Sequence, residues 1–150
     1  RSRLAWLAGH SSTALVGSTV LLAVGGLALG AVFGAADGDS LAQAWRAMLS
    51  ALATAPALWL VVAIPIALVG LRPAWASAAA WLVLVWCIVS GYFGAILGLP
   101  DWLAQTSPFG HVPLWPAQPM RWLPMVVLTV AAVALVLAGA AGVRRRDMPR

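Results

Sequence analysis

The sequence predicts an all-α integral membrane protein, a helical bundle of four transmembrane helices with an external Pro- and Trp-rich segment between the last two. Of its 150 residues, 63% are hydrophobic and only 9% are charged, and the mean hydropathy is +0.95. A soluble domain carries about 25% charged residues, so this chain has too few charges to cover a surface that faces water. Four long apolar runs free of charged residues then supply the membrane crossings.

The first expected span covers residues 12–34, close to the ~20 residues that cross ~30 Å of hydrocarbon. Gly26, Gly30 and Gly34 recur at every fourth residue and give this helix a smooth face. Overlapping GxxxG units of this kind allow another helix to approach closely. The alternative is that glycine is simply common in apolar helices.

The second expected span covers residues 55–71 and follows an amphipathic helix over residues 41–54. We expect that amphipathic helix to lie at the membrane interface before the chain enters the bilayer. Pro56 suits the first turn of the span. Pro65 lies inside it and should kink it, which membrane helices tolerate when neighbouring groups satisfy the released carbonyl.

The third and fourth expected spans cover residues 76–97 and 122–142. Gly94 and Gly98 are four residues apart near the end of the third span and predict a second close helix contact. The chain is therefore predicted to be one transmembrane domain.

Residues 99–120 form the one long segment that is neither a plausible span nor a simple turn. Five prolines forbid a continuous helix there. The aromatic residues of the segment are typical of an element at a bilayer interface, either interfacial or re-entrant. We expect it to form an outer cap whose main residues are Pro100, Trp102, Pro108, Phe109, His111 and Pro113.

Basic residues predict the orientation of the four spans. Only Arg46 and Arg121 fall on the side of the outer segment, and the other arginines fall on the opposite side. Since Lys and Arg are in excess in cytoplasmic loops, both termini and the turn between the second and third spans are predicted to be cytoplasmic in a bacterial cell membrane. The predicted cytoplasmic anchors are Arg1, Arg3, Arg72, Arg144, Arg145 and Arg146.

The expected spans contain no residues that could carry catalysis or ion coupling. They hold no Asp, Glu, Lys or Arg, so a self-contained ion-coupled carrier is disfavoured. His10 and His111 are isolated, whereas a metal site needs several convergent ligands. We assign no catalytic residue, no metal and no cofactor, and an intramembrane enzyme is the weakest hypothesis. Arginines at the ends of apolar runs also argue against a nucleic-acid face.

Three tryptophans, Trp59, Trp81 and Trp86, lie deep in the second and third spans. They are consistent with packing against neighbouring helices. They are also consistent with an aromatic wall along a substrate path, since apolar ligand sites are often lined in this way.

A family resemblance covers essentially the whole chain. Its most telling part is the run from Ser107 to Pro113, and Gly70-Leu71-Arg72-Pro73 and the closing Arg144-Arg145-Arg146-Asp147 match in order and spacing. In these features the chain resembles the C-terminal end of ABC-2-type transporter permeases, specifically the polyketide antibiotic exporter family.

The resemblance implies an all-helical permease with two six-helix halves and a separate cytoplasmic ATP-binding-cassette ATPase as partner. The chain would supply the last four helices and would need the remaining helices of the permease and the lipid bilayer around it. We therefore expect a piece of an ATP-driven exporter of hydrophobic compounds such as polyketide antibiotics, with ATP hydrolysis by the partner. The alternative is a small four-helix membrane scaffold or assembly protein without transport of its own.

Overall fold

The described part of the chain contains helices and turns and no strand. A computed structural model describes residues 3–93, 96–98, 100–113, 115 and 117–147. Four longer helices and a shorter amphipathic one account for most of these residues. In chain order the elements are α1 (Arg3–Asp37), α2 (Ser40–Ala53), α3 (Ala55–Leu71), α4 (Pro73–Ile88), the π-helical segment η1 (Val89–Phe93), α5 (Asp101–Ala104), the 3-10 turn η2 (Pro108–His111) and α6 (Trp122–Asp147).

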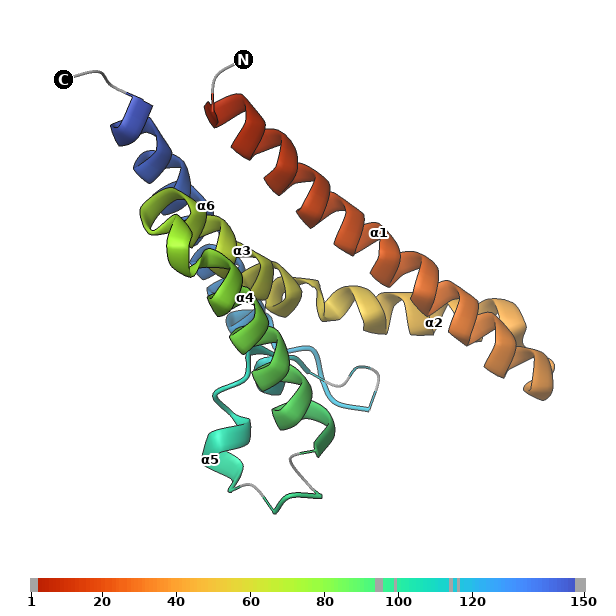
Figure 1. The fold of residues 1–150 in the computed structure, drawn as a ribbon. Coiled ribbons are helices and arrows are strands. Elements are labelled where there is room, and N and C mark those ends of the chain that lie inside the picture. The colour runs from red at the N-terminus through yellow and green to blue at the C-terminus, as the bar shows by residue number, and fades with distance from the viewer. Residues whose placement is uncertain (1–2, 94–95, 99, 114, 116, 148–150) are drawn as a thin grey trace.

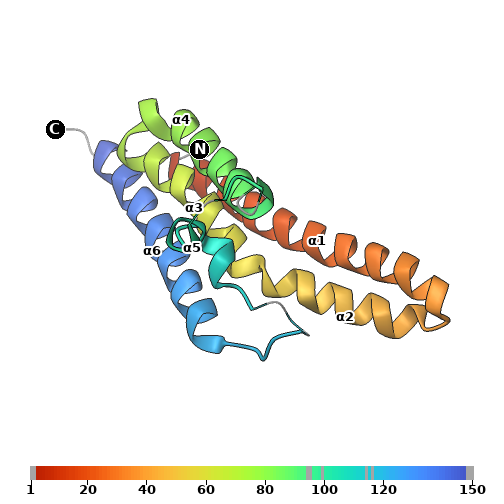
Figure 2. The same ribbon diagram turned by 90° about the horizontal axis from the view of Figure 1, so that it is seen from below.

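The helices form a bundle with a projecting hairpin. Helix α3 packs against both α4 and α6. The start of α1 and the end of α6 lie at the end of the bundle opposite α5 (Figure 1). Helices α1 and α2 run side by side in opposite directions and reach away from that bundle (Figure 2). The Pro-rich segment therefore closes the end of the bundle that is far from the termini.

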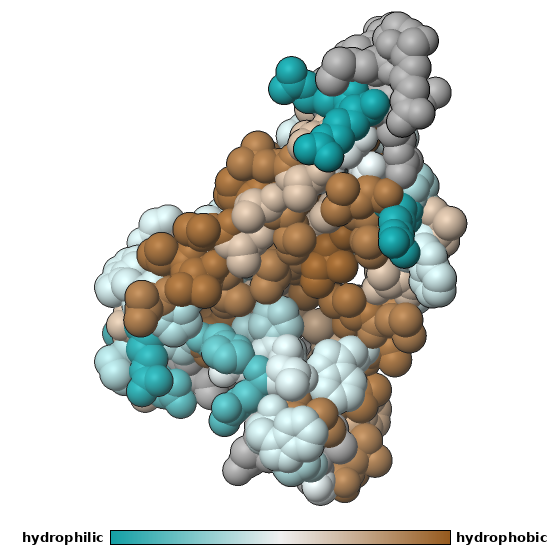
Figure 3. Space-filling view, turned by 90° about the vertical axis from the view of Figure 1, so that its left-hand side faces the viewer, coloured by the Kyte–Doolittle hydropathy of each residue, from teal (hydrophilic) through white to brown (hydrophobic). Residues whose placement is uncertain are grey.

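Four stretches of the described chain are long and apolar enough to cross a membrane. They are Ala5–Ala36, Ser40–Leu71, Pro73–Gly91 and Trp122–Arg145, and only 11–33% of their most apolar parts is buried within the chain. The remaining surface of these helices is open to lipid or to further helices. The face shown in Figure 3 carries a broad apolar belt, with hydrophilic residues gathered toward its two ends.

Helix α1 begins earlier than the predicted span 12–34, because Arg3 to Ser11 continue the same helix. The hydroxyls of Ser12 and Thr13 each donate a hydrogen bond to the Gly9 carbonyl at 2.9 Å, so these polar residues are satisfied inside the helix. With 35 residues, α1 is about 52 Å long. It is therefore longer than the ~30 Å thickness of a hydrocarbon core.

The turn between α1 and α2 is a Schellman-type helix end. Gly38 follows the last helical residue with φ of 78°, a left-handed conformation that glycine adopts without strain. The Asp39 N–H then donates to the Gly34 carbonyl at 3.1 Å. This tight turn folds α2 back along α1.

Helix α2 corresponds to the amphipathic helix predicted over residues 41–54, and it lies directly on the glycine face of α1. A Cβ added at Gly26 would lie 2.7 Å from the Met48 Cα, and one at Gly34 would lie 2.6 Å from the Ser40 Cα. One at Gly30 would meet the Gln43 carbonyl oxygen. Only glycine allows the two backbones to come this close.

Thr54 separates α2 from α3. The Thr54 N–H and hydroxyl both donate to the Ala51 carbonyl, at 3.0 and 2.7 Å. Pro56 has no N–H and its ring would clash with the carbonyl four residues earlier, so the helix cannot run straight through this point. From Ala55 onward α3 continues without a break through Pro65.

Helices α3 and α6 form the tightest contact of the bundle. A Cβ at Gly70 would collide with the Gly139 carbonyl oxygen, and one at Gly142 would lie 2.5 Å from the Gly70 carbonyl oxygen. Ala63 and Ala67 continue the same buried small-residue face on α3. The predictions did not include this contact, although the spacing of small residues in both helices was a signal for it.

The third predicted span, 76–97, differs from the structure at both ends. Helix α4 begins at Pro73, which suits a first helical turn, and the α-helix ends at Ile88 before the π-helical η1. Gly94 lies outside the described residues. Gly98 was predicted to pack against a helix, but it lies in a turn with φ of 60° and nothing within 4 Å of an added Cβ. Its role is conformational, because L side chains rarely adopt this backbone.

We predict that replacing Gly30 by Ala weakens the α1–α2 contact. The new Cβ would lie 2.6 Å from the Ala44 Cα, so one backbone must move. Overpacking of this kind lowers the free energy of unfolding by roughly 1–3 kcal/mol. Titration of the micelle-bound protein with SDS, followed by circular dichroism, measures this loss.

The matched control is Gly25→Ala, on the same helix with nothing within 4 Å of the new methyl group. It should leave the stability unchanged or raise it slightly, since Ala is the better helix former. Equal midpoints for the two variants would show that α2 does not lie against Gly30.

Candidate functional site

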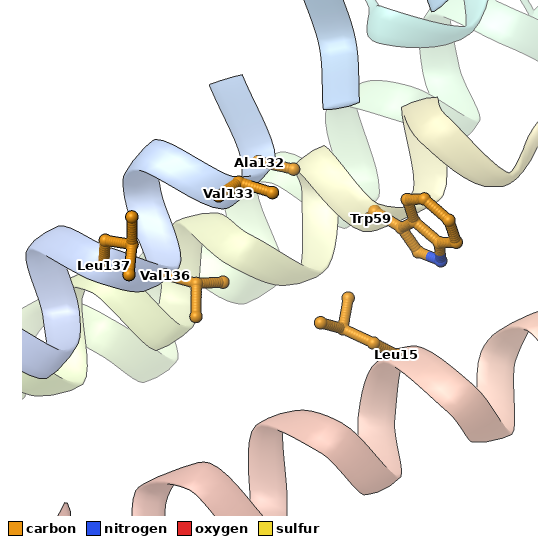
Figure 4. Close-up of a pocket in the computed structure, with 6 residues that line it drawn as sticks. All are labelled: Leu15, Trp59, Ala132, Val133, Val136 and Leu137. Atoms are coloured by element: carbon orange, nitrogen blue, oxygen red, sulfur yellow. The ribbon is translucent and has the colours of Figure 1, made fainter. Parts of the chain in front are cut away.

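A small apolar cavity lies where α1, α3 and α6 meet. It has a volume of about 140 Å³. Leu15 points into it from α1, Trp59 borders it on α3, and α6 supplies the rest of its wall (Figure 4). Its lining residues are Leu15, Trp59, Ala132, Val133, Val136 and Leu137.

Trp59 is held in a defined position. Its indole N–H donates to the Thr19 hydroxyl oxygen at 3.0 Å, and that hydroxyl donates in turn to the Leu15 carbonyl at 2.8 Å. The polar edge of the indole is therefore satisfied, and α3 is tied to α1 by a bond between side chains. Such a bond contributes roughly 0.6 kcal/mol between membrane helices.

The cavity can accommodate apolar groups and nothing strongly polar. All six lining side chains are hydrocarbon or aromatic. An apolar cavity of about 150 Å³ stays free of water and accepts a molecule the size of benzene. This volume suits a ring or a short branch of a larger hydrophobic molecule.

The other two tryptophans of the predicted substrate path lie elsewhere. Trp81 is 65% exposed on α4. Trp86 donates from its indole N–H to the Thr106 hydroxyl at 3.0 Å, and that hydroxyl donates to the Leu103 carbonyl. Neither lines the α1–α3–α6 cavity, so the three tryptophans do not form one continuous wall. Trp86 instead ties α4 to the Pro-rich segment.

The Pro-rich segment is anchored by its middle. Val112 is buried in one cluster with Ala53, Ala57 and Leu128, and Phe109 packs against that cluster from the 3-10 turn η2. The segment therefore sits on the junction of α2 with α3 and on α6. The sequence analysis did not identify Val112, because the prolines around it interrupt any periodic pattern of apolar residues that would have predicted its burial.

Other residues of the predicted outer cap are more open. Trp102 is 68% exposed, and Pro100 and His111 are also exposed, whereas Pro108 is half-buried and Pro113 is buried. Ser107 is 2% exposed, and its hydroxyl has no hydrogen-bond partner within the described chain.

Described arginines mark the end of the bundle where α1 begins and α6 ends. Arg72 is exposed in the turn between α3 and α4, and Arg144 and Arg145 are exposed in the last turns of α6. Arg1 lies outside the described residues, and the side chains of Arg3 and Arg146 are not described. Three of the five exposed arginines of the described chain therefore lie at this end, and the other two are Arg46 and Arg121.

Comparison with known proteins gives one family. Residues 1–144 match the family described as "Multidrug efflux system permease Rv1217c, C-terminal domain". The chain is also 35% identical over 147 residues to the multidrug efflux system permease protein Rv1217c of Mycobacterium tuberculosis (strain ATCC 25618 / H37Rv). That alignment covers 98% of this chain and 27% of the relative, so the chain spans about a quarter of the length of the relative.

We predict that Trp86 restrains opening of the Pro-rich segment. The native cysteine is first removed by Cys87→Ser, and Ser107→Cys then serves as the labelling site (the reporter). Because residue 107 is buried, a maleimide reaches this cysteine only when the segment opens. Trp86→Phe removes the hydrogen bond to Thr106. Because such a bond contributes about 1 kcal/mol, its loss should make labelling roughly fivefold faster. The labelling rate of the reporter in membranes is the measurement.

The control for this prediction is Trp81→Phe, which changes an exposed tryptophan on the same helix. It should leave the rate within twofold of the reporter alone. If the labelling rate did not change with Trp86→Phe, or changed equally with both substitutions, Trp86 would not restrain the segment.

Proposed function

Because the chain belongs to the family of the C-terminal domain of multidrug efflux system permease Rv1217c, we propose that it forms the last four transmembrane helices of an exporter permease. The observation that carries the proposal is the match over residues 1–144 together with four helices long and apolar enough to cross a membrane. A relative about four times as long supports the need for further helices, which would cover the open apolar faces.

The basic end of the bundle is proposed to face the cytoplasm. Arg72, Arg144 and Arg145 are exposed at that end, and cytoplasmic loops carry an excess of arginine. The Pro-rich segment then faces outward and caps the bundle. In this orientation both termini are cytoplasmic in a bacterial cell membrane.

The energy for export is proposed to come from a separate cytoplasmic ATP-binding-cassette ATPase. The expected spans carry no ionisable Asp, Glu, Lys or Arg for coupling to protons or sodium. A partner that hydrolyses ATP would therefore drive the change between two packings of the helices. The arginine-rich end is the surface on which such a partner would act.

The substrates are proposed to be hydrophobic compounds. Within this class, the family resemblance implies polyketide antibiotics. The apolar cavity beside Trp59 supports this class, because it offers contact area and no charge. The close glycine contacts of α1 with α2 and of α3 with α6 support movement by small shifts between backbones. Such a shift would open or close the cavity, since its wall comes from α1, α3 and α6.

We predict that Trp59→Ala lowers export of an apolar fluorescent drug several-fold in cells that carry the complete permease and its ATPase. Loss of the aromatic wall removes roughly 1.5–3 kcal/mol of apolar contact. Trp59→Phe should retain most of the export, because a ring still borders the cavity. Drug accumulation at matched membrane levels of the permease is the measurement.

Two controls accompany this prediction. Trp81→Ala removes an exposed tryptophan outside the cavity and should leave accumulation near the unmodified level. Inactivation of the ATPase partner should raise accumulation to that of cells without the permease. Accumulation that does not respond to the partner would count against ATP-driven export, and equal effects of Trp59→Ala and Trp81→Ala would count against the cavity.

A further inference from the structure

A second cavity, polar where the first is apolar, lies between the Pro-rich segment and the start of α6. Its volume is about 290 Å³. Four polar side chains from residues 105–121 border it, and the rest of the lining is small or apolar. The lining residues are Gln105, Gly110, His111, Val112, Pro113, Gln118, Arg121 and Pro124.

The four polar side chains at this cavity are exposed, so their hydrogen-bond donors are open to solvent and to a ligand. Gln105, Gln118 and Arg121 make no side-chain hydrogen bond or ion pair with any residue that the structure describes. His111 places Nδ1 3.4 Å from the Ser107 carbonyl oxygen, which leaves its Nε2 without a partner in the described chain. Each glutamine amide offers two N–H groups, and the guanidinium offers five.

The charge of the lining favours an anion. Arg121 contributes a permanent positive charge, and the lining contains no Asp or Glu among the described residues. A phosphate group suits this set better than a carboxylate, because its oxygens can accept from several donors that approach from different directions. Arginine also pairs with phosphate through two parallel hydrogen bonds.

We expect this cavity to lie at the level of lipid headgroups. Arg121 immediately precedes the apolar stretch Trp122–Arg145. Trp122 is 67% exposed and Leu123 is 77% exposed beside it. Exposed tryptophan next to arginine is typical of the membrane–water interface, where a phosphate meets the polar cavity and acyl chains meet the apolar helix.

We propose that this cavity binds a phosphate group, carried either by a membrane lipid or by a soluble phosphate. The site is distinct from the apolar cavity beside Trp59 and independent of which drug is exported. Arg121 supplies the charge and the paired donors. Gln105 and Gln118, which precede and follow η2 in the chain, would donate further hydrogen bonds, and a bound phosphate would tie the Pro-rich segment to α6.

The test is native mass spectrometry of the purified, delipidated permease titrated with dioleoylphosphatidylglycerol. Arg121→Gln removes one charge-assisted hydrogen-bonding group and should weaken binding of the first lipid about tenfold or more. Gln118→Ala removes a neutral donor and should weaken it roughly threefold to fivefold. The matched control is Arg46→Gln, which removes the same charge from an exposed position on α2 outside the cavity.

Competition with inorganic phosphate distinguishes the two sources. Lipid binding that depends on Arg121 and resists millimolar phosphate assigns the site to a headgroup. Displacement of the lipid by phosphate, with the same dependence on Arg121, assigns it to a soluble phosphate. Lipid binding weakened equally by Arg46→Gln and Arg121→Gln, or unaffected by Arg121→Gln, would overturn the proposal. Unchanged circular dichroism of the variants ensures that the comparison is between folded proteins.

Discussion

The structure depends on how closely apolar helices can approach one another. Lipid is as apolar as leucine, so burial of hydrocarbon gives little drive for helix association in a membrane. Contact between backbones must supply that drive through dispersion, and only small residues permit it. This chain uses Gly26, Gly30 and Gly34 for the contact of α1 with α2, and Gly70 with Gly139 for the contact of α3 with α6. Within the described chain no large side chain is fully buried.

The Pro-rich segment follows from a second constraint, the need of backbone groups for hydrogen-bond partners. A chain broken by prolines cannot satisfy its N–H and C=O groups in hydrocarbon. It therefore lies at the end of the bundle, where Phe109 and Val112 anchor it to a small core and Trp86 ties it to α4. Few contacts hold its described residues, so we expect it to open more easily than the rest of the described chain.

Much of this architecture was predictable from the sequence. Uncharged apolar runs indicate where helices are long and apolar enough to cross a membrane, and prolines indicate where a helix is interrupted. The start of α1 was not predictable, since Ser12 and Thr13 look like a helix boundary until their hydroxyls are seen to bond the Gly9 carbonyl. The end of α4 was missed because a π-helical segment leaves no mark in hydropathy. The cavity beside Trp59 could not be predicted either. Its walls come from three helices far apart in the chain, and two of these, α3 and α6, approach closely at Gly70 and Gly139.

The central claim is that four helices cross the membrane and place the Pro-rich segment opposite the turn between α3 and α4. The most direct measurement is labelling of single cysteines in intact bacteria with a membrane-impermeant maleimide, in a Cys87→Ser background. The sites Gln118→Cys and Ala74→Cys are both exposed in the described chain. We expect Gln118→Cys to be labelled from outside and Ala74→Cys only after permeabilisation. Labelling of both sites from the same side would contradict the account.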